Sequence, residues 1–531
     1  MSSAILLIVM RKSVLRSLGI LVLGLIQAVF GQDLSQIGGQ ATGKPEQEDL
    51  RNLSLLVRGM MPETLSPAAR VLNSAINKAF KAGDDTATWR LLTRMLLTLQ
   101  GERWDEGLEM LSSYRLTVNR RLAAPGEGVV VALDPLFRLS RPLGRAYTVR
   151  LALVDGRGRT VGKERREEVT EFAPLLHEFA TKGLKDGEYE AVYELLGPEG
   201  ARVAEVRRPV TVNRRLDQRL EKLEKDLERA RGRMEGPRAK AAVETAEYLH
   251  GLMRKARGEY VASARQRAHP FAGRIAGLES MGRYSGEPFR METDLPLAER
   301  LVGAVAAGKD PFAGLTGDLR LAYRSELDGS LQPYRVYVPA KGARRVLVTL
   351  HGVSGDENTY FGAFTGGLLE KLAAERGYLV ASPNGRGPAG GYVGASRRDV
   401  YDVRERAVEL FGMAGAPVFL TGHSMGAMGA WQIAFEKPEL WAGVAPVAGA
   451  MGVTRRMLER NPEMPVFLAQ GAKDRLTIAP VARNVAKPAG EVLKVFEYRE
   501  YPEADHFTIG VASLADVFDF LDRIQVEGGA R

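Results

Sequence analysis

The spacing of hydrophobic and polar side chains changes along the chain, and each change predicts a different kind of structure. Between residues 48 and 113, apolar side chains recur three or four positions apart, as in RVLNSAINKAF and WRLLTRMLLTL, which predicts a helical module. Between residues 114 and 213 they alternate with polar ones, as at Val149, Leu151 and Leu153, and turns such as DGRG follow. This alternation predicts a β-sandwich-like domain.

The pattern changes again in the second half of the chain. Residues 214–267 are highly charged and carry a narrow seam of leucines three and four positions apart, which predicts a charged helical hairpin. The Gly- and Pro-rich residues 268–317, with short helical pieces among them, are interpreted as a linker. In residues 318–531, apolar runs of strand length alternate with helical stretches, as in a doubly wound, mostly parallel sheet covered by helices on both faces. The sequence therefore predicts a multidomain protein.

The first residues resemble a targeting segment. Arg11, Lys12 and Arg16 precede an apolar run from Leu18 to Phe30, and the small residue Gly31 follows. This is the pattern of a secretory signal peptide, here residues 1–31. The alternative is an uncleaved anchor, but an apolar run of 13 residues is shorter than the roughly 20 that a spanning helix needs. We expect a secreted or periplasmic protein with no stable membrane span after signal cleavage.

Composition narrows the possible functions. The chain has 74 Lys and Arg against 65 Asp and Glu, and its net charge of +9 falls to +6 without the three basic residues of the leader. Since basic and acidic residues are interleaved, nucleic acid is not an expected partner. The chain contains no cysteine, which excludes thiol nucleophiles, disulfides and cysteine-ligated zinc.

The pentapeptide GHSMG, residues 422–426, is an instance of the GxSxG motif. It directly follows the strand-like run APVFLT and precedes the helical start AMGAWQIAF. A sharp strand-to-helix turn at this point exposes the hydroxyl of Ser424 above the sheet, while Gly422 and Gly426 let neighbouring backbone pass closely. Ser424 is therefore the candidate nucleophile, and the alternative is a tight turn without chemistry.

A serine nucleophile needs a base and an acid that orients the base. Asp474 follows the strand-like run PVFLAQ, and His506 follows VFEYREYP. Each lies past the carboxyl end of its expected strand, where open α/β sheets place their sites. His423 is expected to pack beneath the turn, and Asp356 and Glu357 to be loop or helix-cap residues. His351, at the end of a strand, is expected to brace the loop that follows it by hydrogen bonding rather than to act as the base.

An oxyanion hole needs two preorganised donors. We expect the backbone N–H of Met425, at the start of a helix, to be one of them. The loop HGVSG, residues 351–355, supplies the other, and Val353 is preferred to Gly352. The loop of residues 384–394 is expected to line the substrate cleft, with Phe361, Phe364 and Tyr392 nearby in sequence. The alternative is that these aromatic side chains simply pack the lid.

LHGVSGDEN, SPNGRGPAGGYVG, TGHSMG, GAKD and ADH together resemble the secreted esterase branch of the α/β-hydrolase superfamily, which includes feruloyl esterases, polyhydroxyalkanoate depolymerases and prolyl-oligopeptidase-like catalytic domains. The resemblance covers residues 318–531. It implies a triad of Ser424, Asp474 and His506, no metal or other cofactor, and an ester substrate, either small or polymer-linked. The alternatives are a prolyl-oligopeptidase-type serine peptidase and a non-catalytic binding or scaffold protein with a vestigial hydrolase domain.

Overall fold

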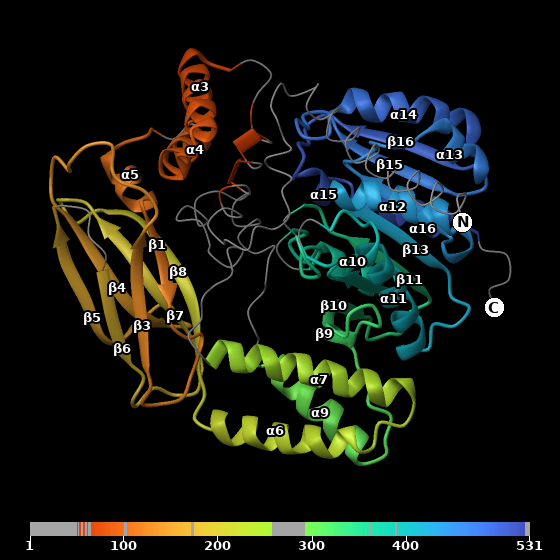
Figure 1. The fold of residues 1–531 in the computed structure, drawn as a ribbon, viewed down its shortest axis with the longest axis horizontal. Coiled ribbons are helices and arrows are strands. Elements are labelled where there is room, and N and C mark those ends of the chain that lie inside the picture. Colours follow the sequence, from red (N-terminus) through yellow and green to blue (C-terminus); the bar gives the residue numbers. More distant parts are fainter. Residues whose placement is uncertain are drawn as a thin grey trace, which may run out of the picture.

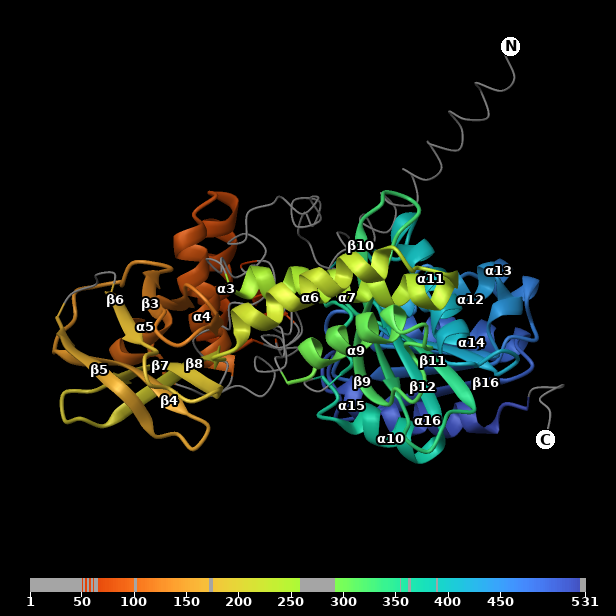
Figure 2. The same cartoon turned by 90° about the horizontal axis from the view of Figure 1, so that it is seen from below.

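The computed structural model describes isolated positions between 50 and 61 and residues 65–525, except for 100–102, 171–174, 258–291, 354, 362–363 and 388–389. The predicted signal peptide lies outside the described residues. Figures 1 and 2 show the earlier helices and two β-sheets on one side, a larger sheet with its helices on the other, and a layer of helices along the edge of the larger sheet. Within the part of the chain described, none of the helices combines the length and apolar character that a bilayer span requires.

The predicted helical module contains α3 (Pro67–Lys81), α4 (Asp85–Leu99) and α5 (Glu106–Ser112). The hydroxyl of Ser66 accepts a hydrogen bond from the N–H of Ala69 at 3.2 Å and so caps α3. Helix α4 packs against both α3 and α5, and Trp89 is buried among its apolar neighbours.

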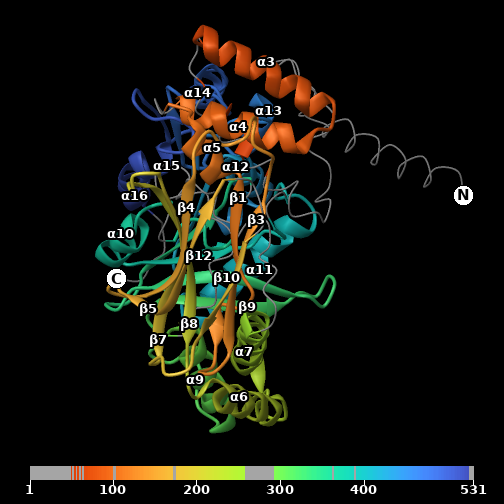
Figure 3. The same cartoon turned by 90° about the vertical axis from the view of Figure 1, so that its left-hand side faces the viewer.

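Residues 114–212 form two sheets, which Figure 3 shows from their own side of the molecule. One sheet has the order β1-β3-β6 and the other the order β2-β8-β7-β4-β5. One hydrophobic core joins both sheets to α3, α4 and α5, so the helices cover the β-sheets instead of forming a separate core. The strands are β1 (Tyr114–Val118), β2 (Leu122–Ala123), β3 (Gly128–Pro135), β4 (Tyr147–Asp155), β5 (Thr160–Val169), β6 (Leu175–Ala180), β7 (Gly187–Leu196) and β8 (Arg202–Val212).

The charged segment forms α6 (Leu216–Arg231) and α7 (Gly236–Arg257), but a further helix, α9 (Asp294–Ala306), packs against both. The prediction of a linker over 268–317 is therefore wrong for this part, while residues 258–291 lie outside those described. The apolar side of α9 is buried in the same hydrophobic core as the larger sheet. The expected hairpin, α6 and α7, therefore forms a layer with α9 that belongs to the same domain as the larger sheet.

The larger sheet has eight strands in the order β9-β10-β12-β11-β13-β14-β15-β16. Strands β9 and β10 are antiparallel to their neighbours, and the others are parallel. The strands are β9 (Gly317–Arg324), β10 (Leu331–Val338), β11 (Arg345–Leu350), β12 (Tyr378–Pro383), β13 (Val418–His423), β14 (Gly443–Val447), β15 (Val466–Gly471) and β16 (Phe496–Tyr501). The helices are α10 (Leu368–Arg376), α11 (Ala395–Leu410), α12 (Met425–Glu436), α13 (Arg455–Arg460), α14 (Ala479–Val492), α15 (Ile509–Ala512) and α16 (Leu514–Arg523).

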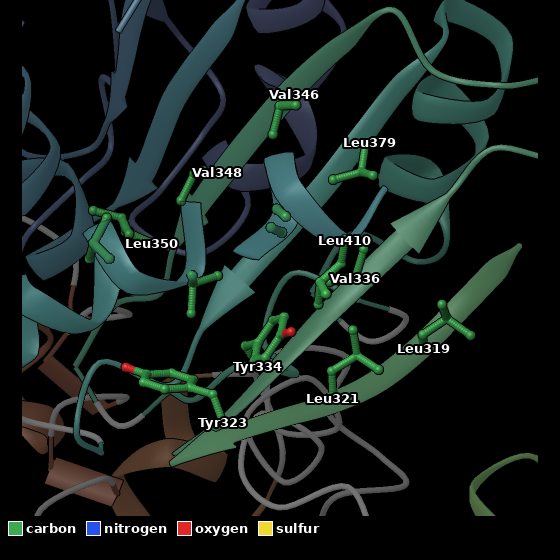
Figure 4. Close-up of a cluster of buried hydrophobic side chains, with 14 of the residues drawn as sticks. Leu319, Leu321, Tyr323, Tyr334, Val336, Val346, Val348, Leu350, Leu379 and Leu410 are labelled. Carbon is green, nitrogen blue, oxygen red and sulfur yellow. The ribbon is translucent and has the colours of Figure 1, made fainter. Parts of the chain in front are cut away.

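Both faces of this sheet are covered. Along β11, Val346 and Val348 belong to the core under α7, α9, α11 and α12, whereas Leu347 between them belongs to the core under α10 and α16. Figure 4 shows the first of these cores, with side chains from β9, β10, β11 and β12 meeting on one face. The continuous apolar runs of the sequence are explained by this double burial, because successive strand residues point to opposite faces.

Candidate active site

Ser424 lies in the sharp turn between β13 and α12. Its backbone has φ 57° and ψ −116°, a conformation that costs energy for a residue with a side chain. A Cβ atom at Gly426 would lie 2.0 Å from the carbonyl oxygen of Leu350, and one at Gly422 would lie 2.3 Å from that of Gly426. The motif therefore needs glycine on both sides of the serine, and it leaves the Ser424 side chain partly exposed.

The three residues expected to act together are close in space. His506 Nε2 lies 2.9 Å from Ser424 Oγ, and His506 Nδ1 lies 2.8 Å from Asp474 Oδ2. Asp474 follows β15, and His506 follows β16, which pairs with β15 in parallel. Adjacent parallel strands end at the same edge of the sheet. This explains how Asp474, 32 positions before His506, and Ser424, 82 positions before it, both reach the imidazole ring.

Asp474 is 1% exposed and accepts several hydrogen bonds. The N–H groups of Leu476 and Thr477 donate to Oδ1, both at 2.8 Å, and Gln470 Nε2 donates to Oδ2 at 3.1 Å. Burial raises the pKa of Asp474, but His506 and the hydrogen bonds lower it by more, so its pKa lies below the ordinary value. The carboxylate is therefore ionised and fixed in orientation beside the imidazole.

His423 supports the loop that carries His506. It is buried, and its Nε2 donates to the backbone oxygen of His506 at 2.6 Å. Burial, together with the neighbouring His506 ring, lowers the pKa of His423 to about 3, so its ring is neutral near pH 7. On the other side, the Phe507 ring meets His506 edge to face at 5.4 Å and packs against the core of the β-sheets and earlier helices.

Met425 and Val353, the two residues whose N–H groups are expected to bind the oxyanion, lie near Ser424 in the chain trace. Met425 is the first residue of α12, so its N–H has no partner within the helix and points toward the N-terminal end. A Cβ atom at Gly352 would lie 3.3 Å from that of Ser424, so the loop after β11 runs directly beside the serine. Val353 follows Gly352 in this loop and is 36% exposed.

The remaining aromatic, aspartate and histidine residues considered from the sequence lie outside the contacts between Ser424, His506 and Asp474. Phe361, Phe364 and Tyr392 are at most 5% exposed and belong to the hydrophobic cores, so they pack beneath the site. Asp505 Oδ1 accepts from the N–H groups of Phe507 and Thr508 and shapes the turn around His506. His177 is half-buried on β6, and His250 lies on α7.

Gln470 and Thr477, which donate hydrogen bonds to Asp474, were not predicted from the sequence. The available signal was a polar residue at the end of an otherwise apolar strand, VFLAQG, and a threonine three residues beyond the aspartate. The expectation that Glu357 is an ordinary loop or cap residue was also incomplete, because Glu357 is 4% exposed and bonded to Asn384.

Two features decide the fold of residues 317–523. In chain order the strands lie 1-2-4-3-5-6-7-8 across the sheet, with the second antiparallel to its neighbours, and the strained serine turn follows the fifth strand. This is an α/β-hydrolase fold. The described residues of the chain contain no group of three or more His, Asp or Glu arranged to hold a metal ion.

No protein-family model matches the chain, and no curated protein matches it. Among solved structures, it is similar to the fluorophosphonate-binding serine hydrolase FphF of Staphylococcus aureus, with 16% identity over 39% of this chain and 99% of that one and a TM-score of 0.34. It is also similar to an S-formylglutathione hydrolase from Agrobacterium tumefaciens, with 18% identity, 40% and 97% coverage and a TM-score of 0.34. A thermostable esterase matches 77% of this chain and 98% of its own, at 13% identity and a TM-score of 0.35.

Proposed function

We propose that the protein is a secreted or periplasmic serine hydrolase that cleaves carboxylic esters through Ser424, His506 and Asp474. The observation that carries this proposal is the continuous chain of contacts from Ser424 Oγ to His506 Nε2 at 2.9 Å and from His506 Nδ1 to Asp474 Oδ2 at 2.8 Å. A hydroxyl hydrogen-bonded to an imidazole that a carboxylate orients is the arrangement that activates serine for attack on a carbonyl carbon.

The proposed reaction has two halves. Ser424 Oγ attacks the ester carbonyl while His506 Nε2 takes the hydroxyl proton, and the resulting imidazolium returns that proton to the leaving alcohol as the ester C–O bond breaks. Water then attacks the acyl-enzyme and gives a proton to His506, which passes it back to Ser424 as the acid product leaves. Asp474 keeps the Nδ1–H tautomer and stabilises the imidazolium.

The negative charge on the tetrahedral oxygen needs donors that are already in place. The N–H of Met425 and that of Val353 are proposed for this role, because the loop with Gly352 packs beside Ser424 and Met425 begins α12. Removing one such donor typically costs about a hundredfold or more in kcat. The positive end of the α12 dipole adds to the stabilisation.

An ester substrate is favoured over a prolyl peptide. Prolyl-oligopeptidase-type domains usually follow a propeller, whereas the described residues of 114–212 form a three-stranded and a five-stranded sheet. The intact contacts between Ser424, His506 and Asp474 also favour an enzyme over a scaffold protein, since a vestigial site has no need to keep all three.

A fluorophosphonate probe tests the proposal directly. We expect the full-length mature protein to be labelled, Ser424→Ala to lose the label, and the matched variant Ser140→Ala, whose hydroxyl bonds Glu109 far from the site in sequence, to keep it. Folded wild-type protein that takes up no label refutes the proposed nucleophile. A panel of p-nitrophenyl acyl esters, feruloyl esters and prolyl peptides then separates the substrate classes, and turnover of the peptides alone overturns the ester assignment.

A further inference from the structure

A buried chain of polar groups lies behind the loop proposed to bind the oxyanion. Gly352 is packed against Ser424 so closely that a Cβ atom there would lie 3.3 Å from the serine Cβ and 3.2 Å from His423 Nδ1. The position of this short backbone segment therefore determines where the N–H of Val353 points. A side chain that holds this segment in place therefore affects the direction of the Val353 N–H, even though that side chain does not touch the substrate.

His351 connects this loop to another one. Its side chain is fully buried, and its two ring nitrogens each lie 2.8 Å from a backbone oxygen, Nδ1 from that of Gly352 and Nε2 from that of Asn384. The Tyr392 ring lies 5.6 Å from the imidazole, and its hydroxyl donates to the His351 oxygen at 3.3 Å. The loop after β11 is thus tied to the turn that follows β12.

Glu357 fixes that turn through the side chain of Asn384. Asn384 Nδ2 donates to Glu357 Oε2 at 2.6 Å, and Asn358 Nδ2 donates to Glu357 Oε1 at 3.1 Å. Asn358 Oδ1 in turn accepts from Arg335 Nη1 on β10 at 3.1 Å. A carboxylate that is 4% exposed is costly unless hydrogen bonds compensate for its lost hydration, and here both of its oxygens are bonded.

The turn is held at a second point. Arg386 has φ 61°, a left-handed conformation that residues other than glycine rarely adopt. Its Nε donates to Asp399 Oδ1 on α11 at 2.8 Å, and its Nη1 lies 2.7 Å from Asp328 Oδ2. Strained backbone persists only where the surroundings over-determine it, and such positions cluster at functional sites. Residues 384–387 therefore form a rigid support for His351.

We propose that Glu357 is a positioning residue for the oxyanion hole, acting through Asn384 and His351 on the backbone of Gly352 and Val353. This inference rests on the proposed esterase function and deepens it. Glu357 takes no part in bond making or proton transfer. It keeps the donor loop in the geometry that the tetrahedral oxygen needs, which is effective only within a few tenths of an ångström.

Two variants of the full-length protein test the role. Glu357→Gln keeps the shape of the side chain, but its new NH2 group must face the NH2 group of either Asn358 or Asn384, so one hydrogen bond becomes a clash between two donors. Asn384→Ala removes the side chain that connects Glu357 to the turn after β12. We expect either substitution to lower kcat about tenfold and to change KM by less than about twofold, because the lost interaction is made in the transition state. The affinity for a trifluoromethyl ketone, which forms an anionic hemiketal on the serine, falls with kcat.

The control is Glu375→Gln on an exposed position of α10, which keeps wild-type kcat and inhibitor affinity. All rates are expressed per site that the fluorophosphonate labels, so loss of folded protein does not count. If both variants keep kcat and inhibitor affinity within about twofold of wild type, the inference is overturned, even if their melting temperatures fall. Absence of label and ester turnover in the wild type is a different result, since it refutes the proposed function itself.

Discussion

Replacement of Gly426 by alanine tests whether close backbone contact builds the serine turn. The added Cβ would lie 2.0 Å from the carbonyl oxygen of Leu350 and 2.7 Å from that of His351, whereas ordinary contacts begin near 3.4 Å. Helix α12 and strand β11 must therefore separate by about 1.4 Å, and a misplacement of about 1 Å can cost a hundredfold in rate. We expect kcat/KM to fall by about that factor, and overpacking to lower the free energy of unfolding by about 1–3 kcal/mol.

The assays for Gly426→Ala are turnover of a p-nitrophenyl ester, the rate of fluorophosphonate labelling and urea unfolding followed by circular dichroism. The matched control is Gly303→Ala on α9, where an added Cβ meets nothing within 4 Å. Alanine at such a helical position stabilises by about 0.5–1 kcal/mol and leaves turnover unchanged. Wild-type kcat/KM and stability in Gly426→Ala contradict the reasoning, because they show that the contact relaxes without cost.

Three further predictions follow from single groups. Asp474→Asn removes the carboxylate that orients His506, and we expect kcat per folded protein to fall by about 10⁴-fold; a loss below about tenfold contradicts the proposed triad. Because the pKa of His423 is lowered from 6.5 to about 3 in the folded state, the unfolded chain binds more protons between these values. Stability therefore falls as pH drops from 6.5 toward 3, and His423→Gln reduces this slope in urea titrations at several pH values; an unchanged slope refutes the assignment. Thr245→Val leaves the backbone of Ala322 without its partner and lowers the free energy of unfolding by about 1–3 kcal/mol; equal stability in urea excludes this role.

The sequence predicted the residues at the carboxyl edge of the sheet because the rule that places them is local. Ser424, Asp474 and His506 each follow an apolar run of strand length, and parallel strands end at one edge, so the three could be assigned without knowing the strand order. The position of Met425 at the start of α12 was predictable in the same way, since the first helical residue after a serine turn is defined by the motif itself.

Buried polar contacts were harder to predict, because they depend on partners far apart in the chain. Glu357 and Asn384 are 27 residues apart, and nothing in the string GDEN distinguishes a buried carboxylate from an exposed one. The burial of helix α9 in the core was not predicted, for a related reason. Its flanking glycines and prolines suggested a linker, whereas its helical state is stabilised by burial of Leu295 and Leu301 against α6, α7 and the larger sheet.

The layer of α6, α7 and α9 packs on the larger sheet for a reason that lies in the edge strand of that sheet, β9. Ala322 on β9 faces Pro333 on β10, and proline has no N–H to donate, so the N–H and carbonyl groups of Ala322 point away from the sheet. Thr245 Oγ1 on α7 lies 3.1 Å from both, accepting from the N–H and donating to the oxygen, and Glu244 Oε2 accepts from the N–H of Arg324 at 3.1 Å. An exposed sheet edge is a template for aggregation. Helix α7 therefore closes the edge of the sheet with its side chains, which explains why a charged helical segment shares the core of the domain that carries Ser424.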